Sequence, residues 1–182
     1  MTEPTAIPDA ADIPVVGAVA RLVAYVLDAL LVSLATYLVL LLLHTFIGPT
    51  VRIAEVDGVP RLSVDRVRFI VDTLFATGVS AAYFVGSWLT WGRTPAQRLI
   101  RARVERVEDG GRLRPVAAVT RWLLLGAPFG LVSALLLPGP GSGAILGVVI
   151  ALYYAVLFIT TARDARKRGL HDRLAGSIVR RR

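Results

Sequence analysis

The chain has no cysteine among its 182 residues, and only two histidines, His44 and His171. Without thiols, disulfides, thiolate–metal sites and cysteine redox chemistry are excluded. The acidic residues are dispersed, and the two histidines fall in segments expected on opposite sides of a membrane. Catalysis needs a nucleophile with its base, or several metal ligands, close together. We therefore expect no enzyme, no metal and no cofactor.

Basic residues are missing from the start of the chain. Residues 1–20 carry Glu3, Asp9 and Asp12 but no Lys or Arg, the reverse of the basic region that opens a secretory signal peptide. We expect residues 1–12 to be a flexible tail and residues 13–182 to form one domain. The first apolar segment should remain as a membrane anchor.

Apolar residues, by contrast, are abundant. Hydrophobic residues make up 55% of the chain although its formal net charge is +8, and its mean hydropathy is +0.63. Crossing a bilayer as a helix takes roughly 20 apolar residues. Segments that meet this requirement lie near residues 22–47, 69–91, 122–137 and 143–162. The sequence predicts an all-α integral membrane protein, a bundle of four transmembrane helices.

Lys and Arg are distributed unevenly between the connections. Seventeen of them lie at Arg21, in segment 92–121 and in the tail 163–182, whereas the connection 48–68 has four. Because basic residues favour the cytoplasmic side, both termini are predicted to be cytoplasmic. We expect the basic loops to contact anionic lipid and not nucleic acid.

The two larger loops alternate apolar and polar residues around glycine-containing turns. Asp57-Gly58 divides residues 52–64, and Asp109-Gly110-Gly111 divides residues 100–116. Each pattern is typical of a short β-hairpin. An isolated hairpin is marginal in water, so each should rest on the membrane or on neighbouring segments.

Charged residues at the span ends are the first candidate functional groups. Arg21 and Asp28 share a helix face, and the uncharged run that follows places Asp28 near the inner interface. Asp72 should lie near the outer interface, solvated beside Arg66 and Arg68. Asp28 is expected to form an ion pair with Arg21, Arg121 or the tail; a proton or cation role is the alternative. His44 has no acidic partner nearby in sequence, so it should extend toward the interface.

The third predicted span is short and is interrupted by Pro128 between Gly126 and Gly130. Broken spans of this kind form substrate sites in transporters, which makes Asp28, Asp72 and Pro128 a candidate ion or proton pathway. The glycines also fit the small-xxx-small spacing of closely packed transmembrane helices. Gly143 and Gly147 share this spacing, and Gly78, Ser80, Ala82 and Gly86 provide a further surface of small residues.

Three separated motifs resemble the RDD family of bacterial membrane proteins, named for an arginine and two aspartates. They are "ARLVAYVLDALL" with Arg21 and Asp28, "WGRTPAQRLIRARVERVEDGGRLRPVAAVTRWLL" ending near Arg121, and "RKRGLHDRLAGSIV" with Asp172. Ala96, Gln97 and Ser177 depart from residues more usual in the family. The resemblance implies a multi-pass helical domain in a bacterial plasma (inner) membrane. Some members have been proposed as cation/proton antiporters.

The tail "KRGLHDRLAG" contains His171 and Asp172, adjacent residues that point in different directions on a helix and so form no catalytic dyad. We expect Asp172 to accept hydrogen bonds from Arg21, Arg121 or Arg173 and to hold the tail against the first and third spans. Arg121, His171 and Arg173 thus form a predicted cytoplasmic basic clasp.

Two functions from different classes follow. The first is a structural or accessory subunit that associates with itself or with a larger membrane complex. The second is a proton-coupled monovalent cation antiporter that acts as an oligomer. The small-residue surfaces and the lack of a concentrated catalytic set favour the first.

Overall fold

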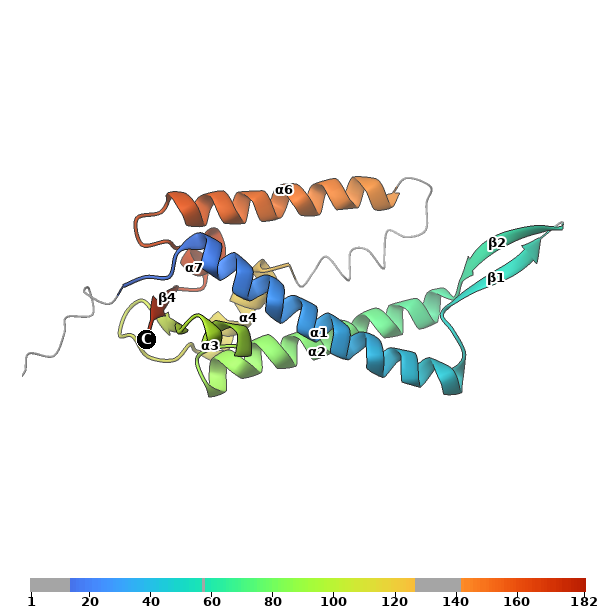
Figure 1. Ribbon diagram of the computed structural model, residues 1–182, viewed down its shortest axis with the longest axis horizontal. Coiled ribbons are helices and arrows are strands. Elements are labelled where there is room, and N and C mark those ends of the chain that lie inside the picture. The colour runs from blue at the N-terminus through green and yellow to red at the C-terminus, as the bar shows by residue number, and fades with distance from the viewer. Residues whose placement is uncertain (1–13, 57, 127–141) are drawn as a thin grey trace, which may run out of the picture.

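The computed structural model describes residues 14–56, 58–126 and 142–182 of the chain (Figure 1). The predicted tail 1–12 and most of the predicted span 122–137, including Pro128, lie outside these residues. The elements are α1 (Ala18–Ile47), β1 (Val51–Val56), β2 (Val59–Val64), α2 (Arg66–Thr90), α3 (Pro95–Leu99), β3 (Ala102–Arg106), α4 (Pro115–Leu124), α6 (Ser142–Arg163), α7 (Leu170–Leu174) and β4 (Ser177–Arg181).

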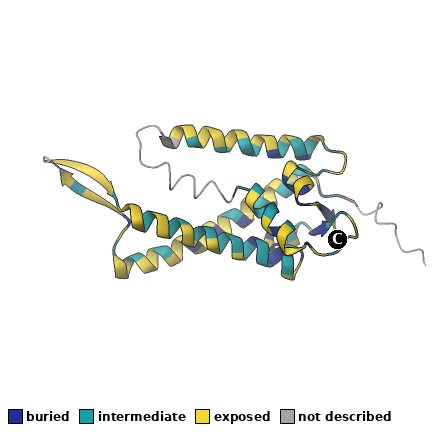
Figure 2. Ribbon diagram, turned by 180° about the vertical axis from the view of Figure 1, so that it is seen from behind, coloured by how far each residue is buried: buried dark blue, intermediate teal, exposed yellow. Residues whose placement is uncertain are grey.

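Three helices, α1, α2 and α6, are long and apolar enough to cross a membrane. They correspond to the predicted spans 22–47, 69–91 and 143–162. With 30 residues, α1 is about 45 Å long at 1.5 Å per residue. Few side chains on these three helices are buried, and the rest are exposed or half-buried (Figure 2). The fold is thus mostly helical, and its apolar helix surfaces face outward, as lipid or another apolar partner requires.

The two ends of the molecule differ in structure (Figure 1). At one end, which we call the hairpin end, β1 and β2 form an antiparallel pair in which Val51 lies opposite Val64. At Gly58, between the two strands, φ is +73°, a left-handed conformation that glycine adopts without steric cost. At the other end, the clasp end, lie α3, β3, α7 and β4.

The hairpin predicted within residues 100–116 is wrong. β3 pairs instead with the C-terminal strand β4, with Val104 opposite Val179. The chain after β3 turns at once, because the N–H of Gly110 donates to the carbonyl of Arg106 at 3.1 Å. It then enters α4 at Pro115, which fits the first turn of a helix. The segment before α1 pairs with the other edge of β4: the N–H of Val16 donates to the carbonyl of Val179 at 3.2 Å, and the N–H of Arg181 donates to the carbonyl of Pro14 at 2.8 Å.

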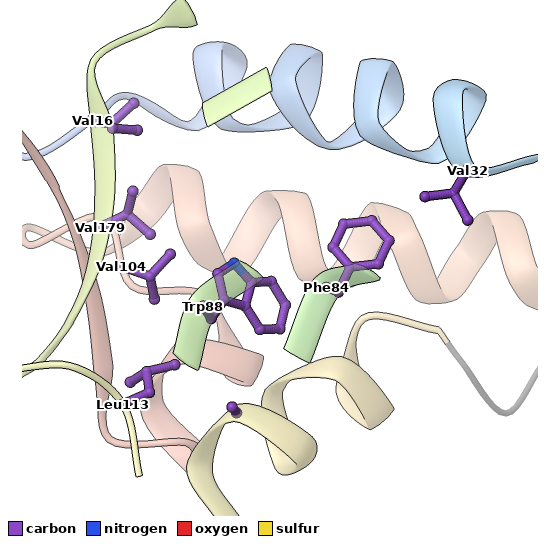
Figure 3. Packing of buried hydrophobic residues seen from close by; sticks show 9 residues of the cluster. Val16, Val32, Phe84, Trp88, Val104, Leu113 and Val179 are labelled. Atoms are coloured by element: carbon purple, nitrogen blue, oxygen red, sulfur yellow. The ribbon is translucent and has the colours of Figure 1, made fainter. Parts of the chain in front are cut away.

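A hydrophobic core fills the clasp end (Figure 3). Trp88 of α2 is almost fully buried and lies beside Phe84, Val104 and Val179. Burial of one such side chain contributes about 1.5–3 kcal/mol. β3 pairs with the distant β4, and not with the residues that directly follow it, because Ile178 and Val179 of β4 add buried apolar side chains next to this core.

Tyrosine hydroxyls from α1 and α6 donate hydrogen bonds to the backbone carbonyls at the end of α4. The hydroxyl of Tyr25 on α1 donates to the carbonyl of Leu125 at 2.8 Å, and Tyr154 on α6 donates to the same carbonyl at 2.9 Å. Tyr153 donates to the carbonyl of Leu124 at 2.5 Å. The last carbonyls of a helix have no partner within it and are costly to leave unmet in lipid. These bonds therefore fix α4 between α1 and α6.

Candidate functional site

Asp172 is the centre of an ion-pair cluster at the clasp end. Its carboxylate accepts a hydrogen bond from Nη1 of Arg21 at 2.8 Å and a second, on the other oxygen, from Nη1 of Arg121. Ser177 joins the cluster, since it accepts from Arg121 at 2.8 Å and donates to Asp172 at 3.1 Å. The Asp172 side chain is 0% exposed. The expected contacts with Arg21 and Arg121 are therefore present.

Arg21 connects four parts of the chain. Besides Asp172 on α7, it donates from Nε to the carbonyl of Val16 at 2.9 Å and from Nη2 to the carbonyl of Val179 at 3.0 Å. It thus joins the start of α1 to the preceding segment, to α7 and to β4. A planar guanidinium can hold several acceptors at once, which a lysine at this position could not do in the same geometry.

Glycine precedes α7 for a steric reason. A Cβ at position 169 would overlap the Thr161 hydroxyl and lie 2.7 Å from Cε1 of His171. The backbone N–H of Gly169 also donates to Asp172 at 3.4 Å. The sequence "GLHD" therefore brings α7 close to the end of α6 and directs Asp172 inward.

His171 and Arg121 are buried beside the same carboxylate. Nε2 of His171 lies 3.5 Å from Oδ2 of Asp172. Burial, together with the nearby Arg121 and Arg21, holds the pKa of His171 well below its usual value, so this imidazole is neutral. Burial, and then Arg21, lowers the pKa of Arg121 to about 9. Arg121 still carries its charge at neutral pH.

Arg173 lies outside this cluster. Its Nη2 donates to Asp164 at 2.7 Å, and half of its side chain is exposed. Adjacent positions on a short helix point in different directions, so Arg173 faces away while Asp172 faces in. The predicted basic clasp of Arg121, His171 and Arg173 is therefore wrong in one member, since Arg21 and not Arg173 contacts Asp172. We call the observed group, Arg21, Arg121 and His171 around Asp172, the Asp172 clasp.

Asp28 forms a second buried site, and the predicted ion pair with an arginine is wrong. Its carboxylate accepts from the Tyr83 hydroxyl at 2.7 Å, from the backbone N–H of Ala96 at 3.0 Å and from the Thr94 hydroxyl. The residue is 2% exposed. Hydroxyl and backbone donors thus satisfy both oxygens of this carboxylate in place of an arginine.

The segment "TPAQ" is folded so that it can reach Asp28. Thr94 and Gln97 form a capping box that starts α3, with Pro95 in the first turn. Gln97 is favourable at this position because its side-chain oxygen accepts from the N–H of Thr94 at 2.9 Å. The box fixes the Thr94 hydroxyl and the Ala96 N–H against α1. The departures from the family at residues 96 and 97 are thus compatible with this site.

A third polar site lies at the hairpin end and was missed from the sequence. Nε2 of His44 lies 3.1 Å from Oδ2 of Asp72, and the Thr50 hydroxyl donates to the same oxygen at 2.5 Å. The expectations that His44 extends alone to the interface and that Asp72 is simply solvated are both wrong. A signal was available: His44 continues the row Asp28, Val32, Thr36 and Leu40, spaced by four on one face of α1.

Arginine at the hairpin end serves another purpose. Nη1 of Arg68 donates to the carbonyls of Ile47 and Gly48, at 2.5 and 3.0 Å, and its Nε lies 3.3 Å from Asp65. It thereby satisfies the end of α1, where a cation also complements the helix dipole. Among the described residues, no Arg or Lys forms an ion pair with Asp72.

Asp72 also lines a cavity of about 420 Å³ between α1, α2 and the end of α4. The walls carry hydroxyl groups from Thr73, Thr77 and Ser80 and rings from Tyr25, Phe84 and Trp122. A smaller cavity of about 80 Å³ lies at the clasp end, beside Arg21 and Asp28. Asp28 and Asp72 thus line different cavities, and Pro128 lies outside the described residues.

In the part of the chain that the structure describes, no three His, Asp or Glu side chains come together to hold a metal ion. A model of the RDD family matches residues 15–176. Neither the curated proteins nor the solved structures give a match. The match contains all three residues that carried the resemblance, Arg21, Asp28 and Asp172.

Proposed function

Because this chain belongs to the RDD family of membrane proteins, we propose that it is a structural or accessory subunit of a membrane assembly. The observation that carries the proposal is the use of its signature residues. The carboxylates of Asp28 and Asp172 accept hydrogen bonds from groups within the chain, and both residues are almost fully buried. Groups held in this way stabilise a fold, whereas an ion-binding carboxylate needs free oxygen lone pairs and access.

The exposed helix faces provide the surface for association. On α2, Gly78 and Gly86 have open space where a Cβ would be added, and Ala82 lies between them at the same spacing. Small residues at every fourth position allow close approach of a second transmembrane helix. We place the contact with a second copy, or with a larger membrane protein, on this face of α2.

Chemical crosslinking in native membranes tests this proposal, because Gly78→Leu and Gly86→Leu add side chains where the chain itself has room. We expect both variants to fold and to lose the crosslinked species. Gly147→Leu on α6, a glycine with the same open space, shows whether the contact is confined to α2. If the unmodified protein gives no crosslinked species and purifies alone, the accessory role is wrong.

The orientation belongs to the same proposal: the clasp end lies in the cytoplasm of a bacterium and the hairpin end outside. The excess of Lys and Arg in segments 92–121 and 163–182 supports it. At the clasp end Arg98 lies over the exposed ring of Trp91, 5.0 Å from its centroid, an arrangement suited to a headgroup layer with anionic lipids. Because the chain has no cysteine, Ser63→Cys and Asp109→Cys are clean reporters. An impermeant maleimide should label intact cells only at Ser63→Cys.

A second candidate function, proton-coupled transport of monovalent cations by an oligomer, is favoured by the cavity beside Asp72. An ionisable group that lines a cavity in a membrane segment is a feature of transport pathways. Flux in reconstituted vesicles decides between the two functions. Cation movement driven by a proton gradient, and lost in Asp72→Asn, would favour transport; no flux above empty vesicles favours the accessory role.

A further inference from the structure

We infer that the cavity beside Asp72 is a binding site for a lipophilic organic cation, a molecule with one positive charge and an aromatic or aliphatic body. This inference goes beyond the accessory role and holds whether or not the chain moves ions. It rests on three features of the cavity: its charge, its lining and its size. Each is independent of the family signature.

The charge comes from Asp72. Its partners are the Thr50 hydroxyl and the His44 ring, and an imidazole is a full cation only when protonated. Arg68, on the first turn of the same helix, is occupied by the carbonyls at the end of α1 and by Asp65. Asp172, in contrast, has two arginines in direct contact. The carboxylate of Asp72 therefore lines the cavity without a permanent counter-cation.

The lining selects the kind of cation. Three aromatic side chains, Tyr25, Phe84 and Trp122, contribute to the walls, and Leu40, Ala76 and Leu125 contribute apolar surface. Phe84 lies 12 residues, about 18 Å, along α2 from Asp72, and Tyr25 stacks on Phe84, so these rings offer apolar surface to the body of the molecule while its charge lies beside Asp72. Ca²⁺ and Mg²⁺ need several oxygen ligands around one point, whereas this cavity offers one carboxylate and scattered hydroxyls. An organic cation uses both the charge and the apolar walls.

The hydroxyls on α2 add hydrogen-bond acceptors without opposing charge. Thr73 and Thr77 donate to helix carbonyls, at 2.7 Å each, and Ser80 accepts from Nε1 of Trp122 at 3.1 Å. Each of these hydroxyl oxygens still has a lone pair that can accept a hydrogen bond. At about 420 Å³, the cavity falls within the range of roughly 300–1,000 Å³ that is usual for small-molecule sites.

Equilibrium dialysis of the full chain in lipid nanodiscs tests the inference, with tetraphenylphosphonium as the probe and empty nanodiscs as the blank. Tetraphenylborate, nearly equal in size and opposite in charge, shows what apolar partition alone contributes. We expect saturable binding of the phosphonium only, accompanied by a change in Trp122 fluorescence that Trp122→Phe removes.

Two variants, each with a control, distinguish phosphonium binding in the cavity from binding elsewhere on the protein or the lipid. Asp72→Asn removes the charge and should weaken phosphonium binding at least about tenfold, the equivalent of 1.4 kcal/mol. Asp65→Asn, an acid at the same end that does not line the cavity and keeps its capping role, should bind as the parent does. Ala76→Leu fills the cavity without changing its charge and should also weaken binding. Its control is Ala35→Leu on the exposed face of α1, which neither lines the cavity nor lies on the association surface.

The inference is overturned if the unmodified chain binds no phosphonium above empty nanodiscs. It is also overturned if tetraphenylborate binds equally well, or if Asp72→Asn and Ala76→Leu both bind like their controls. Should Asp72→Asn fail to fold, Ala76→Leu still decides the matter, since its carboxylate is intact. Loss of association in the α2 glycine variants, with phosphonium binding unchanged, would show that the assembly surface and the cavity act separately.

Discussion

The two ends of the molecule hold the same kind of group, an aspartate beside a histidine, in opposite circumstances. At the clasp end, Asp172 is 0% exposed and is held by two arginines. At the hairpin end, the side chain of Asp72 is 15% exposed and that of His44 is 22% exposed, and Asp72 lines a cavity. A buried carboxylate with fixed cations stabilises a fold, whereas one beside a cavity has capacity left for a ligand. Partner number and access, more than residue type, distinguish the two roles.

Removal of the central carboxylate should have the largest effect. Asp172→Ala leaves Arg21 and Arg121 buried without their counter-ion, and loss of one partner of a buried pair costs about 3–5 kcal/mol. We expect much less folded protein in the membrane, measured by quantitative immunoblotting of membrane fractions. Activity per folded molecule should fall less. Asp109→Ala, which removes an exposed carboxylate, serves as the control, and normal abundance of an inactive Asp172→Ala protein would contradict a structural role.

Neutralisation of Asp28 should have a smaller effect, because no arginine contacts it. Asp28→Asn replaces one acceptor oxygen with an NH₂ group, a donor. Depending on the rotamer, this donor faces the Thr94 hydroxyl, or it faces both the Tyr83 hydroxyl and the Ala96 N–H. A buried donor left without an acceptor costs about 1–3 kcal/mol. Thermal unfolding in detergent should show a lower midpoint than in the parent. An unchanged midpoint would mean that the Asp28 network does not stabilise the contact between α1 and α3.

Acid should weaken the clasp end through His171. The pKa of His171 is lowered in the folded chain, so below about pH 6.5 the unfolded chain binds the proton more readily. Stability is therefore complete above pH 6.5 and falls as the pH decreases, by up to about 1.4 kcal/mol per pH unit. Unfolding midpoints between pH 8 and pH 5 should show this slope in the parent. The slope should be reduced in His171→Gln; equal slopes in the two proteins would exclude His171 as its source.

Sequence alone predicted the elements that depend on local pattern. Apolar runs predicted α1, α2 and α6 because a membrane span is defined by its own length and composition. Of the three arginines expected to donate to Asp172, Arg21 and Arg121 do so and Arg173 does not. The match over residues 15–176 confirms the family. Each of these inferences used residues within one segment or a pattern shared by many chains.

Contacts that depend on tertiary register could not be predicted in this way. The alternation in residues 102–106 indicates a strand but not its partner. β3 pairs with β4 because β4 extends the core around Trp88 and Val104. In the same way, the His44–Asp72 pair requires the relative position of α1 and α2, which neither helix specifies by itself. Asp28 was misassigned for a related reason: its donors come from α2 and α3 and not from the neighbouring arginine.

The comparison between the two ends is tested most directly by one substitution made at each end. Asp172→Asn and Asp72→Asn change the same group to the same amide, and their thermal unfolding midpoints can be measured side by side in the same nanodiscs. We predict a large decrease for Asp172→Asn and a change within about 1 kcal/mol in the free energy of unfolding for Asp72→Asn. Equal decreases, or a larger decrease for Asp72→Asn, would contradict the assignment of the clasp end to stability and the hairpin end to binding.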